Sequence, residues 1–180
     1  MQLNTYNNSW YNPGAHKLVC LIWYMVNAIV FNSYLMPISS IKVSILRFFG
    51  ASVGEGVVVK PKVNIKYPWN LTIGNHVWIG EEAWLDSLAT IEIKDHVCIS
   101  QGAYLLTGNH NYKKQSFDLM VLPITLEEGV WIGAKSIVCP GVHCGKHAIL
   151  TAGSVATKNL DANTINQGNP AEVVRMRYVV

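Results

Sequence analysis

The sequence has few charged residues, no long basic run and no paired cysteine motif, and each absence excludes a class of protein. Charged residues make up 14% of the 180 positions, and the formal net charge is +3. Without a Lys/Arg-rich run, so weak a charge gives no electrostatic case for nucleic acid as a partner. Half of the residues are hydrophobic, which is enough to bury a core and excludes a disordered chain.

The cysteines carry no recognisable redox or metal motif. They are Cys20, Cys98, Cys139 and Cys144, and no two form a CxxC pair. Because no cleavable signal peptide is evident either, we predict reduced thiols at packing positions in a cytoplasmic protein. The Cys/His cluster in residues 139–147 matches no familiar zinc pattern, so no metal site is expected. Phosphate-binding glycine loops, dinucleotide fingerprints and serine nucleophile elbows are also missing.

One apolar segment near the N-terminus raises the question of a membrane. Residues 18–41 carry no charge and lie between Lys17 and Lys42. Asn27, Ser33 and Pro37 are among the residues that interrupt the segment, and no second such stretch follows. Three interpretations stay open: a helix buried against the rest of the protein, a helix on the membrane surface with the protein peripheral on the inner face, and a true span.

The rest of the chain repeats with a period of six residues. Thirteen of fifteen positions in this register are Val, Ile or Leu. The register runs through Val53, Val59, Ile65, Ile73, Ile79, Leu85, Ile93, Ile99, Leu105, Leu126, Ile132, Val138, Cys144, Leu150 and Ala156. Four residues after each comes a second biased position, usually Val, Ala or Ser, and glycine often follows the first position directly.

A six-residue period fits neither an α-helix nor simple strand alternation. It predicts an all-β solenoid, a three-sided prism of short parallel strands in which the branched residue points inward and the small residue lies near a corner. Glycine would supply the unusual backbone angles of a tight corner. Eighteen residues would make one coil, hydrogen-bonded to the next coil in a parallel ladder.

Extra residues fall after every third hexapeptide, at 71–72, 91–92 and 111–125. With three sides to a coil, these insertions must stack on one corner, where loops of a rigid solenoid commonly form the binding face. Solenoid ends also need caps. We therefore expect an N-terminal apolar helical cap over 1–50, a β-helix domain over 51–168 with its long loop at 106–125, and a C-terminal cap over 169–180 formed by a short helix after Pro170.

The stretch LLTGNHNY, followed by GVWIGAKSIVCPGVHCGKHAIL and the ending GNPAEVVR, resembles the hexapeptide acyltransferases. Within them it is most similar to the O-acetyltransferases of the galactoside and maltose group and of colanic acid biosynthesis. The resemblance covers residues 50–178 nearly throughout. It implies left-handed coils, which periodicity alone does not show, and transfer of an acetyl group from acetyl-CoA to a sugar hydroxyl, for instance on an exopolysaccharide or lipid-linked precursor.

The resemblance places the catalytic base in the long loop, where His110 is the candidate. A hydroxyl needs a base to take its proton as it attacks a thioester, and neutral imidazole suits this because its pKa lies close to working pH. The candidate acceptor-binding residues are Asn109, Asp86 and Trp131. For Trp131 two other roles stay open, covering the pantetheine arm and packing between subunits. The family often has Asn close to Trp84, which this chain lacks.

The resemblance also assigns candidates for binding acetyl-CoA. Ala134 and Ala152 match small residues that line the pantetheine track, and Thr157 and Lys158 match a Thr-Lys pair. Lys158 and Arg175 would meet the phosphates, Arg with two-pronged donors and Lys as a point charge.

Trimeric family members imply a homotrimer with active sites between subunits. Two alternatives remain from the sequence: a non-catalytic hexapeptide scaffold, and a zinc-dependent gamma-type carbonic anhydrase. The anhydrase needs a further histidine in the loop, where Gln115 stands five residues after His110.

Overall fold

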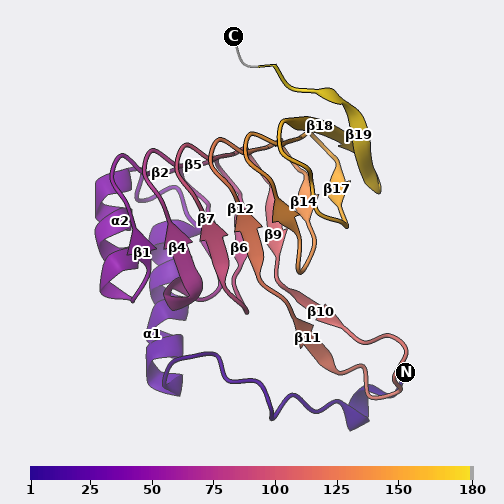
Figure 1. Cartoon of the computed structure of the whole chain (residues 1–180). Coiled ribbons are helices and arrows are strands. Elements are labelled where there is room, and N and C mark those ends of the chain that lie inside the picture. The colour runs from indigo at the N-terminus through magenta and orange to yellow at the C-terminus, as the bar shows by residue number, and fades with distance from the viewer. Residues whose placement is uncertain (179–180) are drawn as a thin grey trace.

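A computed structural model describes residues 1–178 and shows a three-sided parallel β-helix with helices at its N-terminal end (Figure 1). The first sheet contains β1 (Ser52–Val53), β4 (Leu71–Ile73), β7 (Ile91–Ile93), β12 (Ile124–Leu126) and β15 (His143–Cys144). The second contains β2 (Val58–Val59), β5 (Trp78–Ile79), β8 (Cys98–Ile99), β13 (Trp131–Ile132), β16 (Ile149–Leu150), β18 (Thr164–Gly168) and β19 (Ala171–Met176). The third contains β3 (Asn64–Ile65), β6 (Trp84–Asp86), β9 (Tyr104–Leu106), β14 (Ile137–Val138) and β17 (Val155–Ala156).

The six-residue register becomes the core of the prism. Its members are buried from Val59 to Ala156, and only Val53, in the first coil, is partly exposed. Equivalent residues stack in register along each sheet, as Ile79 does on Ile99 in the second sheet. The fold is the predicted left-handed parallel β-helix, and the insertions stack on the corner between the third and first sheets.

The glycines that follow the core positions serve a different purpose from the one predicted. None of Gly54, Gly74, Gly80, Gly133 and Gly145 has a positive φ. A Cβ on Gly133 would instead lie 2.5 Å from the backbone nitrogen of Ala152 in the next coil. Glycine is needed at such corners because successive coils approach closely, whereas residues such as His76 (φ 55°) and Glu82 (φ 60°) adopt the left-handed backbone.

The N-terminal segment forms the expected helical cap. It contains the 3-10 turn η1 (Leu3–Thr5), α1 (Lys17–Val26), the π-helix η2 (Asn27–Phe31) and α2 (Ser39–Phe48). Trp23, Phe31 and Leu46 are buried, and the Trp23 indole N–H donates to the Ile65 carbonyl at 3.0 Å. These contacts close the first coil with apolar side chains. In the part of the chain that the structure describes, neither helix has the length and apolar character needed to cross a bilayer.

The C-terminal segment corrects one prediction. The residues after Pro170 form a strand, β19, antiparallel to β18, and not a short helix. The open edge of the second sheet offers unpaired backbone groups, and the β-branched Val173 and Val174 favour a strand. Arg177 fastens the segment, because its guanidinium donates to the carbonyls of Gly129 and His147, each at 3.0 Å. Residues 179–180 of the expected cap lie outside the described residues.

Candidate active site

The long insertion folds into a β-hairpin that projects from the prism (Figure 1). Its strands are β10 (Gly108–His110) and β11 (Leu119–Val121), with His110 paired opposite Leu119. Buried Thr107 anchors its base: the hydroxyl donates to the Asp86 carbonyl at 2.5 Å and accepts from the Ala89 N–H at 3.0 Å. The predicted loop therefore starts from a fixed point on the preceding coil.

His110 is held in one orientation by groups on its own hairpin. Its Nδ1 lies 2.9 Å from the Phe117 carbonyl oxygen, and the two aromatic rings stack with centroids 4.4 Å apart. A carbonyl can only accept a hydrogen bond, so Nδ1 must carry the hydrogen. In the neutral imidazole the lone pair is then on Nε2, which is the atom available to accept a proton.

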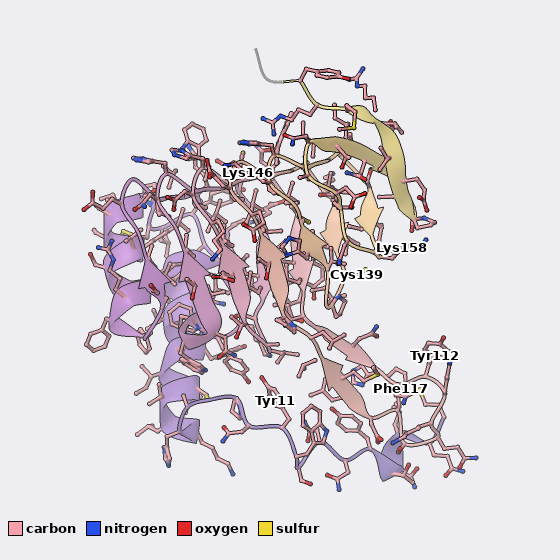
Figure 2. The ribbon with its side chains drawn as sticks, viewed as in Figure 1. Tyr11, Tyr112, Phe117, Cys139, Lys146 and Lys158 are labelled. Atoms are coloured by element: carbon pink, nitrogen blue, oxygen red, sulfur yellow. The ribbon has the colours of Figure 1, made fainter. Side chains whose placement is uncertain are left out.

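The N-terminal arm, residues 1–16, lies against this hairpin. The Tyr6 ring is 5.7 Å from the His110 ring, and the Gln2 N–H donates to the Gln115 carbonyl at 2.8 Å. The Tyr11 hydroxyl donates to the Leu88 carbonyl, also at 2.8 Å. Figure 2 shows Tyr11 on the arm and Phe117 in the hairpin, on the same side of the molecule. Sequence reasoning missed Tyr6, Tyr11 and Phe117, because none falls within the hexapeptide register.

Asp86 is at the base of the hairpin, close enough to Tyr11, Tyr67 and Tyr104 that its charge adds to burial in raising the pKa of each phenol. It is buried, and a Cβ built on Gly108 would lie 3.5 Å from its carboxylate Oδ2. Burial raises the pKa of Asp86 above its usual range, while Lys66 acts in the opposite direction. The structure thus brings together the catalytic candidate's hairpin and the predicted acceptor-binding Asp86. Asn109 is exposed beside His110 and accepts a hydrogen bond from the His110 backbone N–H at 2.7 Å.

The candidate acetyl-CoA residues lie outside the hairpin, at two corners of the prism and on β19. Ala134 and Ala152 stack at the corner between the second and third sheets, where the Gly153 N–H donates to the Ala134 carbonyl at 2.9 Å. Thr157 and Lys158 follow β17, and the Lys158 ammonium is 3.9 Å from the Glu172 carboxylate on β19. Arg175 is exposed on β19. One chain alone therefore places the alanine corner and the His110 hairpin at opposite edges of the third sheet.

The outer faces of the three sheets differ in chemistry. The second sheet presents Trp78 and Trp131, with the Trp131 indole N–H donating to the Ser100 hydroxyl at 2.9 Å. The third sheet presents Trp84 stacked on Tyr104, with ring centroids 4.7 Å apart. The first sheet presents polar outward residues, namely Ser52, Thr72, Glu92, Thr125 and His143. Trp131 therefore lies on an apolar face, away from the hairpin of its own chain.

Known proteins are similar to this chain in both sequence and architecture. The family described as hexapeptide repeat of succinyl-transferase matches residues 123–158. WcaF of Escherichia coli (strain K12), which carries the name of a colanic acid biosynthesis acetyltransferase, is 37% identical over 91% of this chain and 90% of its own length. The chain belongs to the hexapeptide-repeat acetyltransferases. It is also 31% identical to the galactoside O-acetyltransferase of the same organism, over 73% of this chain and 66% of that protein.

Solved structures agree with this assignment. A hexapeptide-repeat acetyltransferase from Vibrio cholerae, solved with acetyl-CoA, superposes with a TM-score of 0.81 at 23% identity over 91% of this chain and 89% of that one. A galactoside acetyltransferase in complex with coenzyme A superposes with a TM-score of 0.77 at 27% identity, over 88% of this chain and 80% of that one. Membership of this family makes the protein an acetyl-CoA-dependent acetyltransferase.

Proposed function

We propose that this acetyltransferase transfers the acetyl group to a hydroxyl of a sugar, on a polysaccharide or lipid-linked saccharide precursor, with His110 as general base. The hydrogen bond from His110 Nδ1 to the Phe117 carbonyl carries the proposal, since it leaves Nε2 free to take a proton. Similarity to a galactoside O-acetyltransferase and to a protein named for colanic acid biosynthesis supports a sugar acceptor.

The proposed reaction needs no covalent enzyme intermediate. Nε2 of His110 takes the proton of the acceptor hydroxyl as its oxygen bonds to the thioester carbonyl carbon. The carbon–sulfur bond then breaks, and the imidazolium returns the proton to the departing CoA thiolate. Stacking on Phe117 and a tilted contact with the Tyr6 ring support the imidazole through both proton transfers. Asp86 and Asn109 would bind acceptor hydroxyls beside the base, and Trp131 would cover a sugar face or the pantetheine arm.

An acceptor screen tests the proposed reaction. Purified protein and acetyl-CoA are incubated with nucleotide sugars, amino sugars and lipid-linked oligosaccharides, and products are identified by mass spectrometry. An alkali-labile acetyl ester on a sugar is the expected product. Transfer restricted to amino groups would contradict the hydroxyl acceptor and leave the acetyltransferase assignment intact.

We further propose a homotrimer in which the second sheet of one chain packs against the third sheet of the next. Trp78 and Trp84 are 58% and 40% exposed in one chain, and such a contact would remove them from water. It would also set the His110 hairpin of one chain beside the second sheet of another, the sheet that carries Trp131. The four free cysteines are consistent with work in the reducing cytoplasm.

The mass of the assembly in solution tests the proposed trimer directly. Light scattering at micromolar concentration should report about three times the chain mass of 20.0 kDa, because closed rings of identical chains bury such faces completely. A monomer with full acetyl-transfer activity would contradict both the assembly and the shared site.

Acetyl-CoA recognition gives a separate prediction. We expect Lys158→Ala and Arg175→Ala each to raise the KM for acetyl-CoA more than they lower kcat, because both residues would bind phosphate and neither would contact the reacting atoms. The effect should shrink with a donor that lacks the 3′-phosphate. Lys146→Ala is the matched control, since Lys146 also has an exposed carboxylate partner, Glu128, at 2.9 Å. Equal losses with both donors would remove these residues from recognition of that phosphate.

A further inference from the structure

The N-terminal helices expose a large apolar surface that the β-helix does not use. The helical-cap surface, as we name it, consists of outward side chains on α1, η2, the connecting segment and α2. It comprises Leu18, Leu21, Ile22, Tyr24, Met25, Ile29, Tyr34, Leu35, Ile38, Ile41 and Phe48. Figure 1 shows α1 and α2 on the outside of the first coils, at the end of the prism remote from β19.

The surface is hollowed as well as apolar. One hollow of about 480 Å³ has the end of α1 and η2 on one side and α2 on the other. Its lining includes Val26, Val30, Ile41, Ile45 and Phe48. A second, of about 440 Å³, is lined by Val19, Ile22, Phe48 and Trp69 among others. Phe48 and Phe49 line both hollows, so the apolar surface is continuous. Phe48 is 84% exposed and contributes little to the folded core.

The charge distribution indicates what covers this surface. Residues 1–54 contain no Asp or Glu, and all 11 acidic residues of the chain lie from Glu55 onward. The same segment contains Lys17, Lys42 and Arg47, of which Lys42 is buried. An apolar helical surface with exposed cations at its border and no anion in its own segment complements a bilayer with anionic headgroups. Exposed Tyr24 and Tyr34 suit the headgroup level, where amphipathic aromatic rings gather.

We propose that the helical-cap surface docks onto an anionic membrane surface and lies in its interface without crossing it. From Lys17 to Phe31, α1 and η2 form a continuous helical segment whose buried side chains, Trp23 and Phe31, face the first coil. The opposite side can therefore enter the headgroup–acyl boundary while the β-helix stays in water.

Docking would also orient the candidate active site. The arm that precedes α1 contacts the hairpin through Tyr6 and Gln2, so α1 and the His110 hairpin belong to one connected unit. A membrane-bound α1 would hold the hairpin close to the bilayer, where a lipid-linked acceptor presents its sugar. This delivery of acceptor rests on the proposed function, whereas docking itself does not.

Vesicle flotation without substrates tests the docking. The full-length protein should float with phosphatidylcholine vesicles that contain about a quarter phosphatidylglycerol, and less with phosphatidylcholine alone. The double variant Leu21→Glu/Tyr24→Glu should bind about tenfold more weakly or worse, because two charges would enter the interface. Phe48→Glu on α2 should act in the same direction. Val174→Glu is the matched control, since Val174 is similarly exposed at the other end of the prism.

The possible outcomes separate the alternatives. Circular dichroism verifies the fold of each variant. If the other variants do not fold, Lys17→Glu tests the proposal by changing only the charge at the border of the surface. Wild-type protein that does not float, or variants that float as well as wild type, would overturn the proposal. An assembly larger than a trimer that dissociates in the variants would also overturn the proposal, because a second copy of the chain would then cover the surface. His110→Ala should float normally, and the variants should acetylate a water-soluble acceptor normally, so failure of catalysis and failure of docking are distinguishable.

Discussion

Replacing His110 with alanine should lower kcat by about 10²–10⁴-fold, the usual contribution of a general base. The variant loses the imidazole whose Nδ1 is 2.9 Å from the Phe117 carbonyl, and with it the free Nε2. The acetyl-CoA dissociation constant should change little, because the candidate residues for the cofactor lie outside the hairpin. Single-turnover kinetics with saturating acceptor, together with calorimetric titration of CoA, would measure the two quantities separately.

The control for this variant is His143→Ala. His143 points outward from the polar first sheet and has only a distant carboxylate neighbour, Glu127 at 3.9 Å. Its loss should leave kcat unchanged. If His110→Ala turned over at nearly the wild-type rate, His110 would have no part in the proton transfer and another base would be required.

Replacing Leu85 with alanine should lower the free energy of unfolding by about 2–5 kcal/mol, the range for large-to-small changes in a packed core. Leu85 is fully buried, with Ile65 and Leu105 stacked on either side of it in the third sheet. The prism is narrow, so few neighbouring side chains can move to fill the cavity. Because each coil touches only its neighbours, the loss should act first on the coils that carry the hairpin.

Denaturant unfolding with the Leu35→Ala variant as control checks this expectation. Leu35 is 80% exposed, so its truncation removes almost no buried contact and should change stability by less than about 0.5 kcal/mol. Equal stability losses in the two variants would mean that burial of the six-residue register does not stabilise the fold.

The sequence predicted the β-helix well because the six-residue pattern repeats a single packing requirement many times. Each branched residue in the register faces the same narrow interior, so no individual exception, such as Cys144 or Ala156, hides the pattern. The outward positions of Trp78, Trp84 and Trp131 followed from the same register. The corner glycines were recognised for the wrong reason, because a close approach between coils leaves the same mark in a sequence as an unusual φ.

The site was less predictable because its geometry depends on backbone groups and on segments outside the repeat. The carbonyl of Phe117 fixes the His110 tautomer, and a carbonyl has no signature in the sequence. The arm that brings Tyr6 to His110 has no period at all. The ending after Pro170 was expected to be helical, yet the unpaired edge of β18 decided its conformation, and that edge exists only once the coils have formed.

The position of the insertions has an evolutionary consequence. All of them leave from one corner, and the long hairpin is anchored at its base, where Thr107 bonds to the preceding coil. Changes of length or composition beyond this attachment need not alter the pairing of any coil. Descendants of such a chain could therefore acquire new acceptors by rewriting the hairpin and the arm that contacts it, while the ladder is inherited unchanged.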